Sequence, residues 1–141
     1  MDTVTADTNV YVSALHFGGR PRQLLELARD GKIRLAISDD IQAEVRRVLR
    51  DKFAWAEERL DHLDALLPSM TVKFHPTRRL AVVRDDPDDD RILECAVASA
   101  SAVVVSGDRH LLGLGQFEGI PIVRVGDYLD RSIAQGRSVH Q

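Results

Sequence analysis

The chain has 141 residues, of which 44% are hydrophobic and 29% charged, a composition that fits an ordinary soluble globular domain with one core. No apolar run approaches the roughly 18 residues of a membrane span, and we expect no signal peptide because the first residues already read as a strand. The only cysteine, Cys95, excludes an intramolecular disulfide and a cysteine-based zinc site, so we expect a cytoplasmic protein. The net charge of −3 argues weakly against a nucleic-acid partner, although 16 arginines against 3 lysines suit bidentate phosphate contacts.

Strands and helices are expected to alternate along the chain. Short apolar runs predict strands over residues 3–6, 33–37, 71–74, 102–105 and 122–125. Helical periodicity and capping residues predict helices over residues 10–15, 21–29, 40–50, 55–67, 89–100 and 127–135. This order predicts an α/β fold, a three-layer α/β/α sandwich around a mostly parallel sheet of four or five strands. We expect one domain over residues 1–135 and a disordered tail over residues 136–141.

The first predicted strand, residues 3–6, leads directly into Asp7 and then into a helix. In an open α/β sheet, binding sites form outside the carboxyl ends of the strands. Asp7 is therefore well placed for chemistry, although an Asp before a helix is equally well explained as an N-cap.

Glu44 lies within the helix predicted over residues 40–50, which Ser38 or Asp39 caps. It is three residues after Ile41 and four before Val48, so it shares their apolar face. A buried glutamate is costly unless it is paired or bound to a cation. The alternative is a glutamate at the edge of the apolar stripe that reaches solvent.

The next helix, residues 55–67, is expected to end at Pro68. Four leucines are predicted to face inward from it: Leu60, Leu63, Leu66 and Leu67. Together with Trp55 they fit a core better than a dimer face.

Five aspartates crowd residues 85–90 and open the helix predicted over residues 89–100. The helix dipole favours one or two acids at this end, but five in six residues repel one another unless a cation is present. The predicted buried positions are Leu93, Ala96, Val97 and Ala100. Because Asp89 lies in line with three of them, it is the first choice for an inward ligand, with Asp90 close behind.

An unbroken valine run, residues 103–105, indicates a strand buried on both faces, as in a parallel sheet. The run ends in Ser106, Gly107 and Asp108, so a second strand ends in an acid. The alternative reading of Asp108 is a simple turn residue.

These acids form the predicted catalytic set: Asp7, Glu44, Asp89, Asp90 and Asp108. The carboxyl ends of parallel strands meet at one edge, where several carboxylates stay ionised together only with cations present. Oxygen ligands favour Mg²⁺ or Mn²⁺, so the four acidic sites, Asp7, Glu44, Asp89 or Asp90, and Asp108, are predicted to share such a cation. Asn9 and Ser106 are expected to orient the carboxylates from behind. The predicted reaction is metal-assisted phosphodiester hydrolysis.

Four segments in this order resemble the PIN domain nucleases, and the resemblance extends from Val4 to about Val125. They are Asp7-Thr8-Asn9-Val10, the helix with Glu44 and Arg47-Val48-Leu49, residues 86–96 (DPDDDRILECA), and residues 105–112 (VSGDRHLL). The pattern is most similar to bacterial PIN proteins described as toxins of toxin–antitoxin systems, which are related to the VapC-type ribonucleases.

The resemblance implies a PIN-like fold, Mg²⁺ or Mn²⁺ dependence, RNA cleavage, a homodimer and inhibition by a small antitoxin. It implies that Asp7 and Asp108 are metal ligands and that Glu44 binds metal directly or through water. The third family acid falls at Asp89 or Asp90, and related sequences often carry Asn at the position that matches Asp90. Ser106 stands where Thr is usual in the family.

Other functions are compatible with parts of this pattern. A receiver-type signalling domain has an acidic pocket on a similar fold, but it needs a lysine near the last strand, and Lys32, Lys52 and Lys73 all precede the fourth. A PIN-like module that binds RNA or a partner without cleavage is a second alternative, and DNA remains a possible substrate because the chemistry lies at the phosphate. Candidate phosphate contacts are Arg20, Arg22 and Arg109, which are equally well explained as solvated surface residues.

Overall fold

The computed structural model describes residues 1–134. The predicted tail over residues 136–141, and Gln135 at the end of the last predicted helix, lie outside the described residues.

Six strands form one sheet in the order β3-β2-β1-β4-β6-β5. The strands are β1 (Thr3–Ala6), β2 (Arg34–Ile37), β3 (Thr71–Lys73), β4 (Val103–Val105), β5 (Gln116–Phe117) and β6 (Ile120–Val123). All neighbours are parallel except β5 and β6, which confirms the predicted mostly parallel α/β sheet. Strand β5 is an addition to the prediction, because two residues are too few to give a sequence pattern. It pairs with β6 across Glu118 and Gly119, both at positive φ, so β6 begins two residues earlier than predicted.

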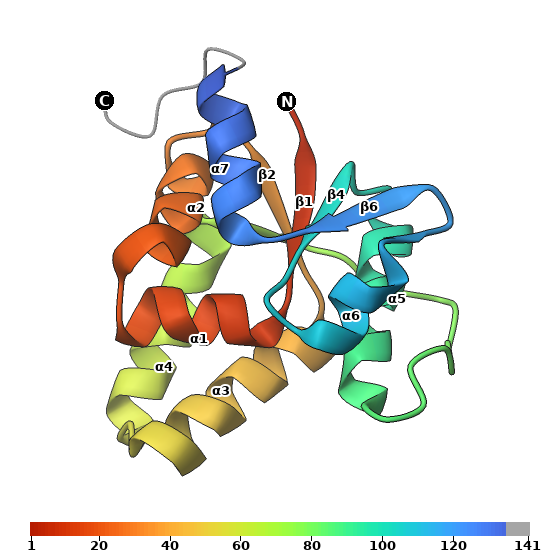
Figure 1. The fold of residues 1–141 in the computed structure, drawn as a ribbon. Coiled ribbons are helices and arrows are strands. Elements are labelled where there is room, and N and C mark those ends of the chain that lie inside the picture. The colour runs from red at the N-terminus through yellow and green to blue at the C-terminus, as the bar shows by residue number, and fades with distance from the viewer. Residues whose placement is uncertain (135–141) are drawn as a thin grey trace.

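The described residues also form seven α-helices and one 3₁₀ helix. They are α1 (Thr8–His16), α2 (Gly19–Arg29), α3 (Asp39–Phe53), α4 (Glu57–Leu66), the 3₁₀ helix η1 (Leu67–Ser69), α5 (Pro87–Ala98), α6 (Arg109–Leu114) and α7 (Val125–Ala134). Helices flank the sheet, with α1 lying along α3 and α7 beside α2 (Figure 1). Because crossovers between parallel strands are right-handed, the return from β3 to β4 places α5 on the face opposite α1 to α4.

Three predicted core positions prove to be wrong or only partly buried. Leu66 is 44% exposed, because α4 ends there and the tighter 3₁₀ turn directs Leu67 inward instead. Helix α5 begins at Pro87 and ends at Ala98, two residues earlier than predicted at both ends. Ala100 therefore lies beyond the helix in the left-handed region, at φ 51°, and is exposed, while Val97 is only partly buried.

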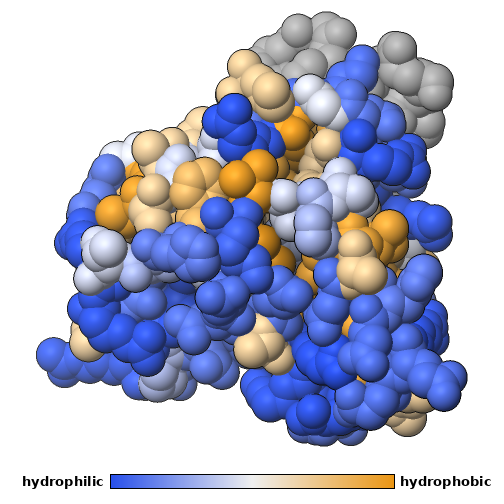
Figure 2. All heavy atoms as spheres, turned by 180° about the vertical axis from the view of Figure 1, so that it is seen from behind, coloured by the Kyte–Doolittle hydropathy of each residue, from blue (hydrophilic) through white to orange (hydrophobic). Residues whose placement is uncertain are grey.

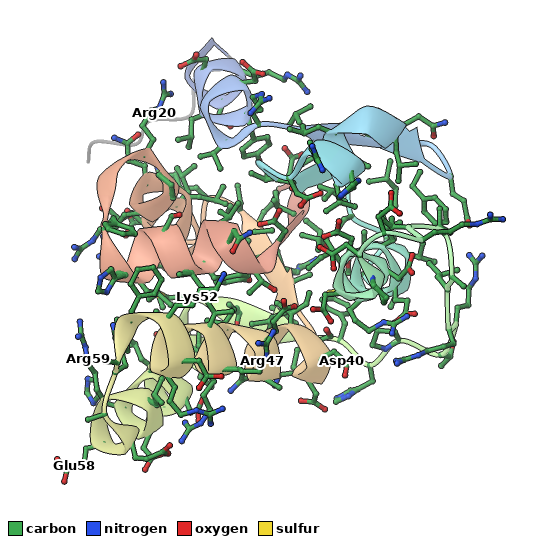
Figure 3. The ribbon with its side chains drawn as sticks, turned by 60° about the horizontal axis from the view of Figure 1, so that its bottom comes forward. Arg20, Asp40, Arg47, Lys52, Glu58 and Arg59 are labelled. Atoms are coloured by element: carbon green, nitrogen blue, oxygen red, sulfur yellow. The ribbon has the colours of Figure 1, made fainter. Side chains whose placement is uncertain are left out.

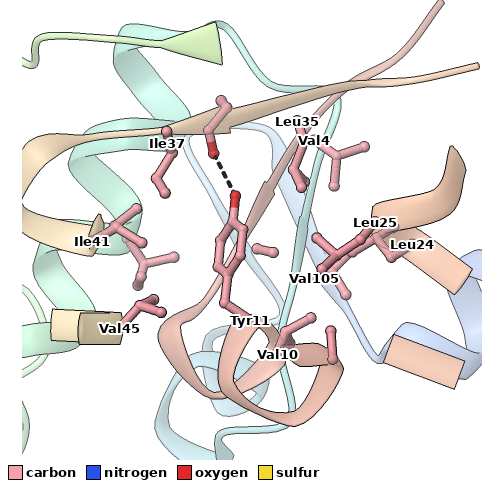
Figure 4. Close-up of a cluster of buried hydrophobic side chains, with 14 of the residues drawn as sticks. Val4, Val10, Tyr11, Leu24, Leu25, Leu35, Ile37, Ile41, Val45 and Val105 are labelled. Atoms are coloured by element: carbon pink, nitrogen blue, oxygen red, sulfur yellow. Dashed lines mark hydrogen bonds between the residues drawn. The ribbon is translucent and has the colours of Figure 1, made fainter. Parts of the chain in front are cut away.

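The core surrounds Tyr11, which is fully buried between the sheet and α3 (Figure 4). Its hydroxyl donates to the Ala36 carbonyl oxygen over 3.4 Å, and burial raises the pKa of the phenol well above its usual range. Burial also raises the pKa of the Cys95 thiol to about 11, which makes this residue a packing group rather than a nucleophile.

One face of the molecule is mostly polar. Hydrophilic residues cover most of the face seen in Figure 2, with hydrophobic side chains in smaller areas between them. None of the helices within residues 1–134 combines the length and the apolar character that crossing a bilayer requires.

Candidate active site

The carboxyl ends of β1 and β4 define the site. From β1 the chain builds the sheet outward through β2 and β3, and from β4 it builds it in the other direction through β6. The boundary between β1 and β4 is thus a topological switch point, where open α/β sheets form their ligand-binding crevices. Asp7 follows β1 directly, and its backbone N–H donates to the Val105 carbonyl oxygen at 3.0 Å. This pairing brings Asp7 beside the turn that carries Asp108.

Ser106 links the two strand-end acids. Asp7 caps α1, with Oδ1 accepting from the Val10 N–H at 3.0 Å, and its Oδ2 accepts a short hydrogen bond from the Ser106 hydroxyl. The same Ser106 oxygen accepts from the Asp108 N–H at 2.9 Å. Ser106 is fully buried, so its hydroxyl holds both residues in register from behind the site.

Asp108 is also a helix cap. Its Oδ1 accepts from the backbone N–H groups of His110 at 2.8 Å and Leu111 at 3.2 Å, at the start of α6. Both capping acids therefore have one oxygen fixed by a helix N-terminus, which orients the carboxylate as a whole.

The N-terminus of α5 supplies the other aspartates. Carboxylate oxygens of Asp86, Asp89 and Asp108 lie within 4.8 Å of one another. Sequence reasoning did not single out Asp86, because it placed the start of the helix at Asp89. The available signal was the pair Asp86-Pro87, since an acid before a proline in the first turn is a typical N-cap pattern, and Asp86 indeed accepts from the Asp88 N–H at 3.1 Å.

Glu44 reaches the same place from α3. The Thr8 hydroxyl donates to Glu44 Oε2 at 3.0 Å, and 19% of the glutamate side chain is exposed. Burial raises the pKa of Glu44; the Thr8 hydrogen bond opposes this shift and the charge of Asp88 adds to it.

The acids enclose a narrow cleft with a volume of about 40 Å³. Its lining residues are Asp7, Thr8, Asn9, Glu44, Asp86, Asp88, Asp89, Ile92 and Asp108. The cleft thus contains four of the five predicted acids, together with Asn9, and adds Asp86 and Asp88. Such a space suits an ion rather than an organic ligand.

Asp90 points elsewhere. Its side chain is buried, and Oδ1 accepts from the backbone N–H groups of Val82 at 2.9 Å and Val83 at 3.0 Å. One turn later Glu94, also buried, accepts from the Leu80 N–H at 2.7 Å. These two acids fasten the segment of residues 74–86 to α5, and Asp90 does not line the cleft.

The carboxylates in the cleft differ in proton affinity. Burial, reinforced by the hydrogen bond with Asp108 and its charge, raises the pKa of Asp89 to about 8. Burial acts to raise the pKa of Asp108 too, but hydrogen bonds from Asp89 and from the α6 backbone outweigh it and lower that pKa. The pKa of Asp7 is raised, chiefly by burial. Asp89 is therefore the proton-bearing member of a pair with Asp108 when no cation is bound.

The residues of the cleft fit a divalent cation. Asp89 Oδ2 is buried and accepts no hydrogen bond from any residue in the described part of the chain. An unsatisfied buried carboxylate oxygen is costly, and here it lies in a group of three carboxylates that offer oxygen ligands only. Hard cations such as Mg²⁺ and Mn²⁺ prefer this donor set.

Asp90→Asn should leave Mn²⁺ affinity and melting temperature close to those of the wild type, because an amide oxygen can accept the same two backbone hydrogen bonds. Asp90→Ala removes the acceptor, and we expect the free energy of unfolding to fall by about 1 to 3 kcal/mol. Thermal unfolding and Mn²⁺ titration of both variants check this. A normally folded Asp90→Asn protein with weakened Mn²⁺ binding would instead make Asp90 a ligand.

The predicted phosphate-binding arginines are dispersed. Arg20 pairs with Asp130 at 2.7 Å, and Arg22 lines a separate groove between α1, α2 and α4, so neither lies in the cleft lining. Arg109 is exposed and directly follows Asp108. The arginine that does approach the acids is Arg47, at 3.6 Å from Glu44 and 4.0 Å from Asp88. Figure 3 shows Arg47 on α3, far from Arg20.

The structure thus defines an α/β protein with an acidic cleft at the switch point of a mostly parallel sheet. The sequence matches the PIN domain model over residues 3–110, and the chain belongs to the PIN domain family. The resemblance noted from the sequence is thereby confirmed at the level of the family.

Two solved structures have a similar fold. One is a chain in the crystal structure of VapBC2 from Rickettsia felis bound to a DNA fragment from their promoter, with a TM-score of 0.61 and 14% identity over 85% of this chain and 96% of that chain. The other is PAE2754 from Pyrobaculum aerophilum, with a TM-score of 0.60 and 21% identity over 96% of this chain and 97% of that chain. A comparison with curated proteins gave no match.

Proposed function

We propose that this protein is a metal-dependent endoribonuclease that hydrolyses RNA phosphodiester bonds and acts as the toxin of a toxin–antitoxin pair. The observation that carries the proposal is the group of Asp86, Asp89 and Asp108, which bring carboxylate oxygens within 4.8 Å of one another, while Asp89 Oδ2 is buried without a hydrogen-bond partner in the described part of the chain. Membership of the PIN domain family supports nuclease chemistry at this cleft.

The residues of the site fall into three roles in the proposed mechanism. Asp7, Asp86, Asp89 and Asp108 would hold Mg²⁺ or Mn²⁺, and the bound ion would lower the pKa of a water molecule and offset charge on the phosphate. Ser106 fixes Asp7 through its hydroxyl. Glu44, held by Thr8 at the cleft wall, is placed to orient a water or to accept its proton.

The proposed partners follow from the same reading. The similar R. felis structure is described as VapBC2 bound to promoter DNA, and this supports a cognate antitoxin protein for the present chain. We further propose that the chain works as a homodimer in the cytoplasm.

Cleavage of a pooled RNA substrate by the purified protein tests the function. We expect discrete cuts with Mg²⁺ or Mn²⁺ and none with EDTA, because the carboxylates alone lack the cation that the chemistry needs. A matched pool of single-stranded DNA tests the choice of nucleic acid. Absence of cutting in both pools, with Mn²⁺ binding established by titration, would favour a module that binds without cleaving.

A further inference from the structure

A second hollow adjoins the acidic cleft. It has a volume of about 280 Å³, and its lining includes three arginines, Arg47, Arg79 and Arg91. Glu44 and Asp88 line both spaces and form the wall between them. The second hollow therefore lies directly beside the cleft, and we call it the arginine groove, defined by Arg47, Arg79 and Arg91.

Arg47 has donors to spare. Its neighbour Arg46 is committed to the fold, with hydrogen bonds of 2.6 to 2.9 Å to Asp64, Glu57 and Asp61 of α4. Arg47 is 52% exposed at its side chain, and its acidic neighbours lie at 3.6 and 4.0 Å, too far for hydrogen bonds. Adjacent arginines on one helix thus differ: one ties α3 to α4, and the other faces the groove.

Arg79 is similar, although it comes from another part of the chain. Its acidic neighbours are Asp40 at 3.6 Å and Glu94 at 3.9 Å, and 72% of its side chain is exposed. It lies on the segment of residues 74–86, which the buried acids of α5 fasten in place. The fold therefore fixes the backbone that presents Arg79 while its guanidinium remains accessible.

Arg91 forms the base of the groove. Only 15% of its side chain is exposed, and it donates to Glu94 at 2.7 Å and to the Leu80 carbonyl oxygen at 3.0 Å. Its Nε is buried without a hydrogen-bond partner in the described part of the chain. Arg91 therefore adds positive charge close to the groove but is tied to the structure, unlike Arg47 and Arg79.

These groups match a phosphodiester. Guanidinium groups donate two parallel hydrogen bonds to phosphate oxygens. A nucleic-acid strand is a polyanion, so a strand with one phosphate among the cleft carboxylates needs positive charge at the next phosphate to offset repulsion. The lining of the groove also carries three acids, Asp40, Glu44 and Asp88, so the charge available to a phosphate comes from the exposed guanidinium groups of Arg47 and Arg79.

We propose that the arginine groove binds the phosphate adjacent to the scissile phosphate of a single-stranded RNA, with Arg47 and Arg79 as its direct contacts. The inference rests on the proposed function, since the scissile phosphate defines the neighbouring position. It assigns to the groove the task of positioning the strand across the cleft.

The test measures RNA binding without cleavage. The protein carries Asp7→Asn, Mg²⁺ is present, and the anisotropy of a short labelled single-stranded RNA is followed at several salt concentrations. Adding Arg47→Ala and Arg79→Ala should weaken binding about tenfold, and the slope of log affinity against log salt should fall by about 0.7 for each phosphate that the protein no longer neutralises. The control is Arg34→Ala. Arg34 is an exposed arginine at the amino end of β2, in register with Thr3 of β1, whereas the cleft lies at the carboxyl ends of the strands.

Cleavage kinetics in the otherwise wild-type chain separate this inference from the proposed function. Arg47→Ala with Arg79→Ala should raise KM with little change in kcat, because a uniform binding interaction is removed. If the wild type cleaves RNA and the double variant matches Arg34→Ala in KM, affinity and salt slope, the groove proposal is wrong and the nuclease stands. If the wild type cuts nothing but RNA binding still depends on both arginines, the groove remains an RNA phosphate site, while the nuclease proposal fails and with it the assignment of the neighbouring phosphate as scissile. RNA affinity that is unchanged while binding of an acidic protein partner disappears would also overturn the groove proposal.

Discussion

Asp7→Asn should reduce metal-dependent RNA cleavage by at least about 100-fold, equivalent to about 2.7 kcal/mol of transition-state stabilisation. Asp7 is buried at the end of β1 and lines the cleft with the α5 acids. An amide at this position keeps the shape of the side chain and removes its negative charge, so we expect the cleft to bind the cation more weakly.

The fold should survive this substitution. Asn is as good an N-cap as Asp, so its Oδ1 can still accept from the Val10 N–H of α1. Its amide N–H can donate to the Ser106 hydroxyl oxygen, whereas in the wild type the Ser106 hydroxyl donates to Asp7. Because burial raises the pKa of Asp7, its ionised form is disfavoured in the folded protein, and the uncharged Asn should not lower the melting temperature.

Single-turnover cleavage rates, with circular dichroism of the same samples, measure the effect. Asp51→Asn is a matched control, since Asp51 is an exposed acid of α3 paired only with Arg50 in the described structure. We expect the control to cleave like the wild type. Full activity of a folded Asp7→Asn protein would remove Asp7 from the mechanism.

The sequence predicted the strand-end acids because their signal is local. Asp7 and Asp108 each follow a short apolar run. A parallel sheet brings the carboxyl ends of its strands to one edge regardless of the conformation of the loops. Glu44 was found through helical periodicity, which depends on neighbours three and four residues away. These positions required only the strand and helix pattern, and the structure places all three in one cleft.

The positions that sequence reasoning missed depend on contacts between distant segments. The helical face alone could not exclude Asp90 as a ligand in favour of Asp89. Asp90 differs from Asp89 because its carboxylate accepts hydrogen bonds from backbone N–H groups of the segment of residues 74–86. That segment has no helix or strand, so its path left no pattern to read. Arg47 is exposed on α3. Its relation to Arg79 depends on the same segment.

Asp89→Asn should make the metal-free protein more stable at pH 8, although it removes a proposed metal ligand. Burial and the neighbouring carboxylates raise the pKa of Asp89 from 3.8 to about 8. The folded state therefore holds this proton more tightly than the unfolded state. The stabilisation that results is complete below about pH 3.8 and is lost progressively as the pH rises towards 8.

Asparagine reproduces the protonated form of Asp89 at every pH. Its amide can donate to Asp108 as the protonated carboxyl does. In EDTA at pH 8 we expect the free energy of unfolding of the variant to exceed that of the wild type by about 0.5 to 2 kcal/mol, the range of common stabilising substitutions. This corresponds to a melting temperature higher by about 2 to 8 °C. The difference should shrink as the pH falls towards 5.

Asp108→Asn provides a control of opposite sign. The pKa of Asp108 is lowered, so its ionised form stabilises the folded protein above the unfolded pKa of 3.8, and its removal should lower the melting temperature at pH 8. Two neighbouring Asp→Asn changes in one cleft are thus expected to shift stability in opposite directions.

Melting curves in EDTA from pH 5 to 9, repeated with Mn²⁺, complete the test. Added Mn²⁺ should stabilise the wild type in proportion to the logarithm of its concentration and should stabilise Asp89→Asn much less, so the order of the two proteins reverses. A variant less stable than the wild type in EDTA at pH 8 would contradict the assignment of the proton to Asp89. Ionised Asp89 is expected to destabilise the metal-free protein at pH 8. The difference in free energy of unfolding between Asp89→Asn and the wild type therefore measures how much stability the fold gives up to keep a cation-binding carboxylate in the cleft.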